Sequence, residues 1–251
     1  MELRQIQKSD YNLILELDAK VYPVSEENKI NFSIIDNWYN KYPKYGMIYI
    51  DTKDNNNNNN IIALAIIIPM PISIWYKLIK GEYFENNLNI NWDNINNNKY
   101  IDIGVHIYHI EVLNRNIVGK EFYKIMLKDL SQISKNYCHN IQGLSGYCVT
   151  IKGNRLFKEI LKCKNADDIK DKINNENKSE FIVENINTGK IKIVELPRNT
   201  DINKNYLDKD DNKNINNEYK FISKCNMLYT IKNKENNEID KDNDNISLVW
   251  D

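Results

Sequence analysis

The region from residue 101 to residue 161 alternates between strand-like and helix-like segments, and this alternation constrains the fold more than any other feature. Residues 101–113 are rich in β-branched and apolar side chains, which predicts a long strand near the centre of a sheet. A helical repeat follows, then a second strand-like segment at residues 141–150, then another helical repeat. The apolar faces of the two predicted helices are formed by Phe122, Tyr123, Met126, Leu127 and Leu130 and by Leu156, Phe157, Ile160 and Leu161. Because strands that alternate with helices are typical of layered folds, we predict an α/β architecture.

The remaining segments add strands and helices at both ends. Residues 3–6, 47–51 and 61–68 are strand-like, and residues 181–185 and 190–196 flank a Thr-Gly turn as in a hairpin. A last strand, split by polar residues, is predicted over 219–231. Two early helices are predicted from apolar residues at helical spacing, which are Leu13, Leu17 and Val21 in one and Phe32, Ile35, Trp38 and Tyr39 in the other. A third helix is predicted over 74–84. Ser9 and Asp10 are predicted to cap the first of these helices and Ser73 the third.

Charge and composition restrict the class of protein. The net charge is -1 at pH 7, which gives no basic footprint for nucleic acid. The longest apolar run, residues 61–72, is interrupted by two prolines and is too short to span a bilayer, and no apolar leader opens the chain. The four cysteines form no CxxC pair, and the histidines give no metal spacing, so no metal site is predicted. We expect a cytoplasmic protein with free thiols.

Three blocks resemble the GNAT superfamily of N-acetyltransferases. One is the strand Leu64-Ala65-Ile66-Ile67-Ile68 running into Pro69-Met70-Pro71 and a helix that closes with Gly81-Glu82, as in a bacterial-type GNAT subgroup. The second is Ile107-Tyr108-His109-Ile110-Glu111-Val112, followed by Asn114 to Lys120 and an amphipathic helix. The third is Val149-Thr150-Ile151-Lys152-Gly153-Asn154-Arg155-Leu156-Phe157. The blocks lie within residues 1–165, and they imply a mixed central sheet flanked by helices.

The resemblance implies that acetyl-CoA is the acyl donor. The family binds the pyrophosphate with a Gln/Arg-x-x-Gly-x-Gly/Ala loop. With Arg115 in the first position, Val118 and Lys120 replace the glycines; with Asn114 first, which the apolar phase of the helix favours, Ile117 and Gly119 take these positions. Backbone N–H groups at a helix N-terminus still suit a phosphate, although a missing glycine leaves less room. The expected cofactor contacts are Ile110, Val112, Leu113, Asn116, Ile117, Val118, Gly119, Lys120 and Asn154. Taken by itself, a glycine before a helix such as Gly119 is more often part of a plain strand-to-helix turn.

The resemblance also places the reacting groups on the fourth strand. In the family the strand parts from the fifth strand and its backbone N–H faces the thioester oxygen, which maps to Ile110 through Leu113. The candidates for the base are Glu111, His109 and His106, with Glu111 preferred because it directly precedes Val112. By strand alternation, His109 and Glu111 share one side and His106 and Val112 the other. The tyrosine that often serves the family as general acid is replaced by Leu161.

We therefore predict one GNAT-like domain over residues 1–231. Asparagine-rich or polar loops are expected near 52–60, 86–99 and 197–218, with a disordered tail over 232–251. Residues 55–60 and 198–217 are expected to be mobile and to be cut first by proteases. The predicted activity is acetyl-CoA-dependent transfer to a small-molecule or protein amine. A weakly active or inactive module that keeps the fold for CoA binding or interaction is the alternative. The sequence does not indicate the acceptor or the oligomeric state.

Overall fold

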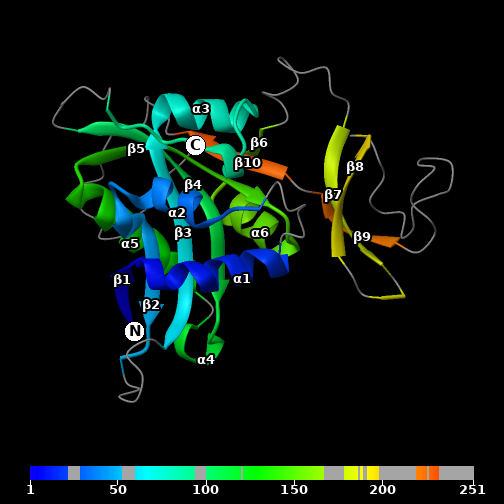
Figure 1. The fold of residues 1–251 in the computed structure, drawn as a ribbon, viewed down its shortest axis with the longest axis horizontal. Helices are drawn as coiled ribbons and strands as arrows, with labels where there is room; N and C mark the ends of the chain where they lie inside the picture. The colour runs from blue at the N-terminus through cyan, green and yellow to red at the C-terminus, as the bar shows by residue number, and fades with distance from the viewer. Residues whose placement is uncertain are drawn as a thin grey trace.

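A mixed seven-stranded sheet forms the centre of the molecule (Figure 1). The computed structural model describes residues 1–21, 29–52, 60–93, 100–119, 121–166, 178–185, 187–188, 191–197, 219–224 and 226–231. The strand order is β1-β2-β3-β4-β5-β10-β6. Only β4 and β5 pair in parallel; the other neighbours are antiparallel. The strands are β1 (Glu2–Gln5), β2 (Gly46–Ile50), β3 (Ile61–Pro71), β4 (Ile101–Val112), β5 (His139–Cys148), β6 (Lys164–Asn165) and β10 (Asn226–Ile231).

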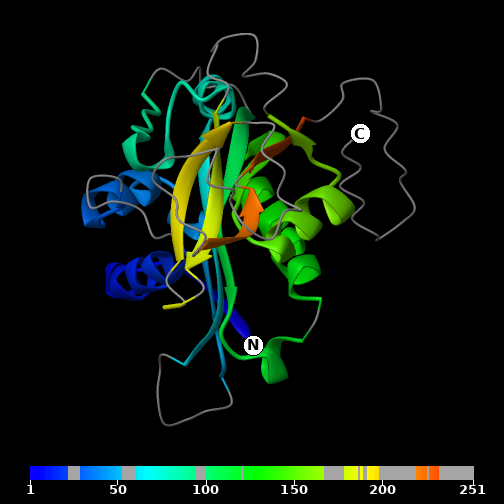
Figure 2. The same ribbon diagram turned by 90° about the vertical axis from the view of Figure 1, so that its right-hand side faces the viewer.

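Helices cover both faces of this sheet. Helices α1 (Tyr11–Val21), α2 (Phe32–Tyr39) and α3 (Ile72–Lys80) lie on one face, and α5 (Phe122–Asn136) and α6 (Ile151–Arg155) lie on the other (Figures 1 and 2). The short helix α4 (Arg115–Val118) follows the far end of β4. The 3-10 turns are η1 (Lys8–Asp10), η3 (Pro43–Tyr45) and η4 (Glu85–Asn87), and the π-helical turn η5 (Leu156–Ile160) continues α6. The predicted α/β fold with a mixed sheet flanked by helices is therefore confirmed.

Glycines on β4 and β5 let aromatic rings lie directly on the sheet. A Cβ added to Gly104 or Gly143 would stand 2.0 or 2.3 Å from atoms of Trp75, and one added to Gly146 would stand 2.3 Å from Phe157. Trp75 belongs to α3 and Phe157 to η5. Because atoms cannot approach so closely, glycine at these positions is what allows both helical layers to pack against the β4–β5 pair.

Two predicted helix caps are wrong. Helix α3 begins at Ile72 after Pro71, so Ser73 lies inside the helix, and the helix ends at Gly81 in the left-handed region (φ 78°). Asp10 precedes α1, but its carboxylate accepts two bonds of 2.7 Å from the Arg4 guanidinium and one of 2.8 Å from the Gln7 N–H. The ion pair with Arg4 therefore uses the carboxylate that was expected to cap α1.

The polar stretch after α3 contributes to the core as far as Asp93. Leu88, Ile90 and Trp92 alternate along the chain and are all buried. Ile90 N–H donates to the Asn37 side chain over 3.0 Å, which fixes the segment to α2. Every second residue from Leu88 to Trp92 therefore belongs to the core, whereas residues 94–99 lie outside the described residues.

The C-terminal strands divide between two sheets. The predicted hairpin is confirmed, since β7 (Lys178–Asn185) pairs antiparallel with β8 (Ile191–Pro197). The predicted last strand forms two strands, β9 (Tyr219–Lys224), which pairs with β7, and β10, which joins the main sheet beside β5. A three-stranded sheet β8-β7-β9 results. The expectations for 53–59, 198–218 and 232–251 fall outside the described residues.

Candidate functional site

Strands β4 and β5 pair along only part of their length. The last pair in register is Ile107 with Gly146, after which β4 continues to Val112 and β5 to Cys148. On its other side, β4 stays paired with β3 as far as Val112 opposite Ala63. The sheet therefore opens between β4 and β5 beyond Ile107, and residues 110–113 follow this point along β4.

The pairing with β3 fixes the direction of the β4 backbone groups. Leu113 N–H donates to Ile62 C=O over 2.9 Å, which makes the pair Ala63–Val112 one without mutual hydrogen bonds. By alternation, the N–H and C=O groups of Val112 and Ile110 point away from β3. They point toward the edge of β4 that is no longer paired with β5. Leu113, which was expected to join them, instead directs its N–H to β3.

A bulge in β4 changes the predicted sides of its histidines. Ile66 stands opposite His109 and Ile67 opposite Ile107, so Tyr108 is an extra residue on β4. Tyr108 donates from its hydroxyl to Asp18 Oδ1 of α1 over 2.5 Å, and the adjacent His109 also lies near enough to lower the pKa of Asp18. The bulge therefore breaks the alternation that was predicted to put His106 and Val112 on one side. His109 and Glu111, which both follow the bulge, share one side as predicted.

Glu111 and His109 form a pair at the open part of β4. Nε2 of His109 lies 3.8 Å from Oε2 of Glu111; the histidine is buried and the Glu111 side chain is 38% exposed. This contact lowers the pKa of Glu111, and the positive charges of Arg115 and Lys152 act in the same direction. Glu111 is therefore ionised at neutral pH and faces cationic groups from both α4 and α6.

Asp18 is a second carboxylate on this face. Burial raises its pKa to about 6, while the Tyr108 hydroxyl opposes this shift and the charge of Glu85 adds to it. The carboxyl group therefore titrates close to neutral pH. Sequence reasoning missed Asp18, because a single aspartate on the polar side of a predicted helix gives no signal.

His106 lies at the centre of a buried hydrogen-bond chain. Its Nδ1 is 2.8 Å from Ser145 Oγ and its Nε2 is 2.6 Å from Oε1 of Glu85. Trp75 Nε1 donates to the same Ser145 Oγ over 2.8 Å. His106 and Ser145 are opposite each other on β4 and β5, one position before the strands part. Both ring nitrogens of His106 are thus occupied, and the side chain is fully buried.

The loop after β4 differs from a direct strand-to-helix turn. N–H groups of Asn116, Val118 and Gly119 donate within the α4 turn, to the Asn114 side chain, Asn114 C=O and Arg115 C=O respectively. Gly119 ends α4 with φ 78° and ψ -178°, and Ile117 is exposed. Lys120, which was also expected to contact the cofactor, lies outside the described residues. Gly119 therefore serves the turn itself.

Asn154 and Leu161 have structural contacts on the α6 side. Asn154 Nδ2 donates to Thr150 C=O over 3.1 Å, and Thr150 Oγ1 accepts the Gly153 N–H as the α6 N-cap. Leu161 is buried in the core. The position where the resemblance expects a tyrosine thus packs among apolar side chains.

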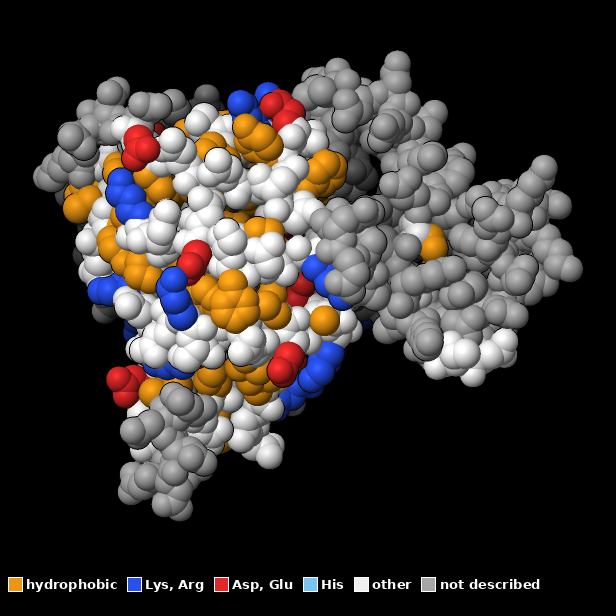
Figure 3. All heavy atoms as spheres, viewed as in Figure 1, with side chains coloured by type: hydrophobic (Ala, Val, Ile, Leu, Met, Phe, Trp, Pro, Cys, Tyr) orange, Lys and Arg blue, Asp and Glu red, His pale blue; other side chains and the backbone are white. Residues whose placement is uncertain are grey.

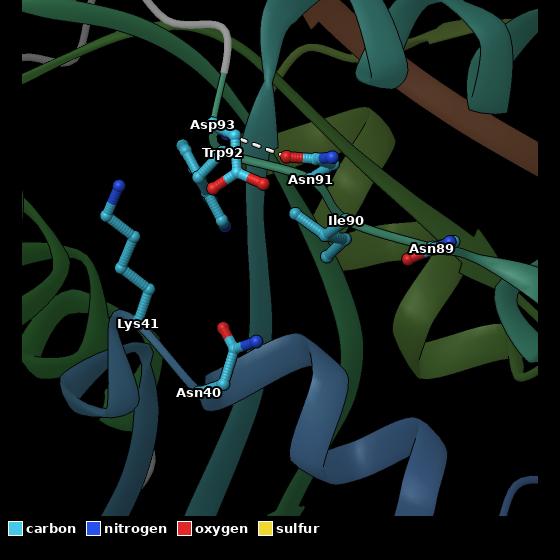
Figure 4. A pocket seen from close by; sticks show the side chains of 7 residues that line it. All are labelled: Asn40, Lys41, Asn89, Ile90, Asn91, Trp92 and Asp93. Carbon is cyan, nitrogen blue, oxygen red and sulfur yellow. Dashed lines mark hydrogen bonds between the residues drawn. The ribbon is translucent and has the colours of Figure 1, made fainter.

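Two surface pockets lie beside the C-terminal end of α2. One, of about 490 Å³, is lined by Asn40 and Lys41 and by residues 89–93, where Asn91 Oδ1 accepts the Asp93 N–H over 2.7 Å (Figure 4). The other, of about 540 Å³, extends from Asn40 toward β1 and Tyr11. Neither pocket is lined by a residue of β4 or β5, so both are separate from the opening between these strands.

The surface of the α1–α3 face is mixed in charge. Lys and Arg side chains lie interspersed with Asp and Glu side chains among uncharged ones (Figure 3). The described part of this face therefore has no continuous basic surface. Across the described ranges, no helix is both long and apolar enough to cross a membrane. In the same residues, no group of three or more His, Cys, Asp or Glu side chains is placed to hold a metal ion.

No protein-family model and no curated protein matches this chain. Solved structures that are similar to it include Naa20 of Chaetomium thermophilum with a bisubstrate analogue, at 11% identity, 92% coverage of this chain, 86% of that one and a TM-score of 0.41. NAA60 of Arabidopsis thaliana with a bisubstrate analogue has 11% identity, 92% and 97% coverage and a TM-score of 0.44. Arylalkylamine N-acetyltransferase 2 of Aedes aegypti has 11% identity, 92% and 98% coverage and a TM-score of 0.44. Because these TM-scores are low, the similarities carry no argument about the activity of this chain.

Proposed function

We propose that this chain transfers an acetyl group from acetyl-CoA to an amine, as the resemblance to the GNAT superfamily implies. The observation that carries the proposal is the parting of β4 and β5 after Ile107, which turns the N–H and C=O groups of Ile110 and Val112 into the opening. Backbone polar groups away from water need partners. The amides of the pantetheine arm of CoA supply a donor and an acceptor at intervals along an extended chain.

We assign the pyrophosphate of CoA to the N-terminus of α5. This helix has 15 residues, and free N–H groups with a positive partial charge at a helix start favour an anion. Asn116, Val118 and Gly119 donate their N–H groups within α4. Their proposed role is therefore to hold the turn that presents α5, with Ile117 and Lys120 beside the cofactor. Asn154 is proposed to hold the β5–α6 turn on the opposite side of the opening.

At the acyl carbon, we assign the oxyanion contact to the backbone N–H of Ile110 or Val112. Such a donor stabilises the negative charge that develops on the thioester oxygen. Glu111 is ionised and partly exposed beside the opening. We propose that its carboxylate faces the positive charge that the acceptor nitrogen acquires as it attacks, and that His109 holds this carboxylate. The thiolate leaves without a tyrosine donor, since a thiol near pKa ~8.5 is a good leaving group.

Binding and turnover of acetyl-CoA test the proposal directly. Acetyl-CoA should raise the thermal midpoint, and at a hundredfold excess over Kd the gain is about 2.7 kcal/mol. Release of free CoA thiol in the presence of a primary amine should be detected with a thiol reagent. If neither CoA nor acetyl-CoA shifts the midpoint at millimolar concentration, the opening between β4 and β5 is not an acyl-CoA site.

A CoA-binding module without turnover is the second candidate. The observation that favours it is Leu161, which is buried where the resemblance expects an acid. A thermal shift with acetyl-CoA, combined with no thiol release for any amine tested, would identify this candidate as the correct one.

A further inference from the structure

The hydrogen-bond chain from Trp75 to Glu85 has a defined direction. An indole N–H only donates, so Ser145 Oγ accepts from Trp75. The serine hydroxyl then donates to Nδ1 of His106, which leaves the proton of a neutral imidazole on Nε2 to donate to Glu85. This tautomer, assigned from the network, satisfies every group in the chain. The series of hydrogen bonds therefore ends on the Glu85 carboxylate, which Trp75, Ser145 and His106 hold in place.

Glu85 is the only end of this chain that reaches solvent. His106 and Ser145 have no exposed surface, whereas the Glu85 side chain is 22% exposed. Within the described residues, His106 is the sole hydrogen-bond partner of its carboxylate, through Oε1. Glu85 is also near enough to raise the pKa of Asp18, which binds Tyr108 of β4, and that of Cys148 at the end of β5. Through its bond to His106, the carboxylate lies beside the point where β4 and β5 part.

We propose that Glu85 is a further catalytic residue, which takes the first proton from the acceptor amine, and that His106, Ser145 and Trp75 position it. This inference rests on the proposed acyl transfer. His106 itself, a candidate base in the sequence, is sealed from any substrate and acts through Glu85. Ser145 is equally sealed, so the Ser-His-Glu series is not a nucleophile and its base.

The proton balance requires such a group. An alkylammonium loses one proton to Glu85 Oε2, and the freed lone pair then forms the C–N bond to the thioester carbon. The C–S bond breaks with its electron pair on sulfur, and nitrogen loses its second proton, which protonates the thiolate. Glu85 returns its proton to water through its exposed edge. An amine that is already neutral in solution needs no first deprotonation, so its reaction does not need Glu85.

The experiment compares two amines in the full-length protein at pH 7.5. n-Butylamine is protonated in solution, whereas 2,2,2-trifluoroethylamine is largely neutral. We expect Glu85→Gln to lower kcat/KM for n-butylamine about a hundredfold, the usual size of a general-base contribution. For trifluoroethylamine the loss should stay below about threefold. Glu85→Asp should recover part of the loss, and His106→Gln should show the same selective loss to a smaller extent.

The control is Glu2→Gln, which removes an exposed carboxylate on the edge strand β1. It should leave both amines unchanged. Equal losses for both amines in Glu85→Gln would mean a structural role only and overturn the inference, as would no loss for either. In both cases, turnover by the wild type would still support the proposed acyl transfer. No thiol release from the wild type with either amine would overturn the acyl transfer itself, and the inference with it.

Discussion

At the scale of single residues, Gly119 and Gly81 show how backbone conformation limits the sequence. Both have φ 78°, but ψ is 18° at Gly81 and -178° at Gly119. The first lies in the left-handed helical region, which asparagine also adopts, and the second in a region essentially reserved for glycine. Gly119 therefore matters for the path of the chain even though open space surrounds it.

Replacing these glycines by asparagine should separate the two conformations. Gly119→Asn should lower the free energy of unfolding by about 1–3 kcal/mol, the cost of forcing a side chain into a glycine region. Gly81→Asn should lower the free energy of unfolding by only a small fraction of that amount. Urea denaturation of both variants measures the difference. Equal costs would show that the turn after α4 relaxes to accept a side chain.

Asp18 gives a pH-dependent prediction. Its pKa is raised from 3.8 to about 6 in the folded protein, so between pH 4 and pH 6 the folded state holds the proton more tightly than the unfolded state. The stability that this group contributes is therefore lost as pH rises through that window. Asp18→Asn keeps an acceptor for Tyr108. At pH 7.5 its free energy of unfolding should exceed that of wild type by at most about 3 kcal/mol, at about 1.4 kcal/mol per pKa unit, and its thermal midpoint should be higher.

The advantage of Asp18→Asn should shrink as the buffer is lowered toward pH 5, because wild-type Asp18 then becomes protonated. Thermal unfolding of both proteins, followed by circular dichroism at pH 7.5 and pH 5, measures this difference in stability. A gain that is independent of pH would show that burial of the charge is not its source.

At the scale of elements, α3 is fixed to the sheet by one aromatic side chain. Trp75 covers Gly104 and Gly143 and bonds Ser145, so it joins α3 to both β4 and β5. Glu85, in η4 after this helix, lies 2.6 Å from His106 of β4, one residue before the last β4–β5 pair.

A double-mutant cycle should reveal this coupling. Gly104→Ala should destabilise the protein by about 1–3 kcal/mol, because its methyl group would overlap Trp75. In a Trp75→Leu background, where the indole is gone, the same alanine should cost less than about 0.5 kcal/mol. Additive costs from urea denaturation would mean that the overlap is relieved elsewhere.

At the scale of the whole molecule, His139 joins distant parts of the chain. It lies among Tyr42, Tyr45, Trp92 and Tyr137, and its Nδ1 is 2.9 Å from the Tyr45 hydroxyl. Burial lowers its pKa to about 4, and the charge of Lys41 acts in the same direction. The folded protein therefore keeps this histidine neutral where the unfolded chain would protonate it.

This histidine should make the protein sensitive to acid. Its contribution to stability is present above pH 6.5 and is lost as pH falls toward 4, which opposes the effect of Asp18 over the same window. In the Asp18→Asn background the thermal midpoint should consequently fall more steeply from pH 6.5 to pH 4.5 than in wild type. Parallel curves would show that one of the two groups does not titrate as described.

Local patterns in the sequence determined the order of the elements and most of their bounds. The long apolar strand at 101–112, the amphipathic repeat of α5 and the Thr-Gly hairpin each have a periodicity that is independent of distant contacts. Boundaries were less predictable where the deciding residue acted through backbone conformation, as Pro71 and Gly81 do for α3. The alternation of Leu88, Ile90 and Trp92 was visible, but the surrounding asparagines obscured it.

Only the tertiary structure decided which side chains meet. The bulge at Tyr108, the end of the β4–β5 pairing at Ile107 and the separation of β9 from β10 depend on strands far apart in sequence. For the same reason the sequence indicated His106 without its partner Glu85, which is 21 residues away in the turn η4. The spacing of apolar residues in the sequence indicates which face of a helix or strand is apolar. Hydrogen bonds between elements depend on how those faces pack, and no local pattern encodes that.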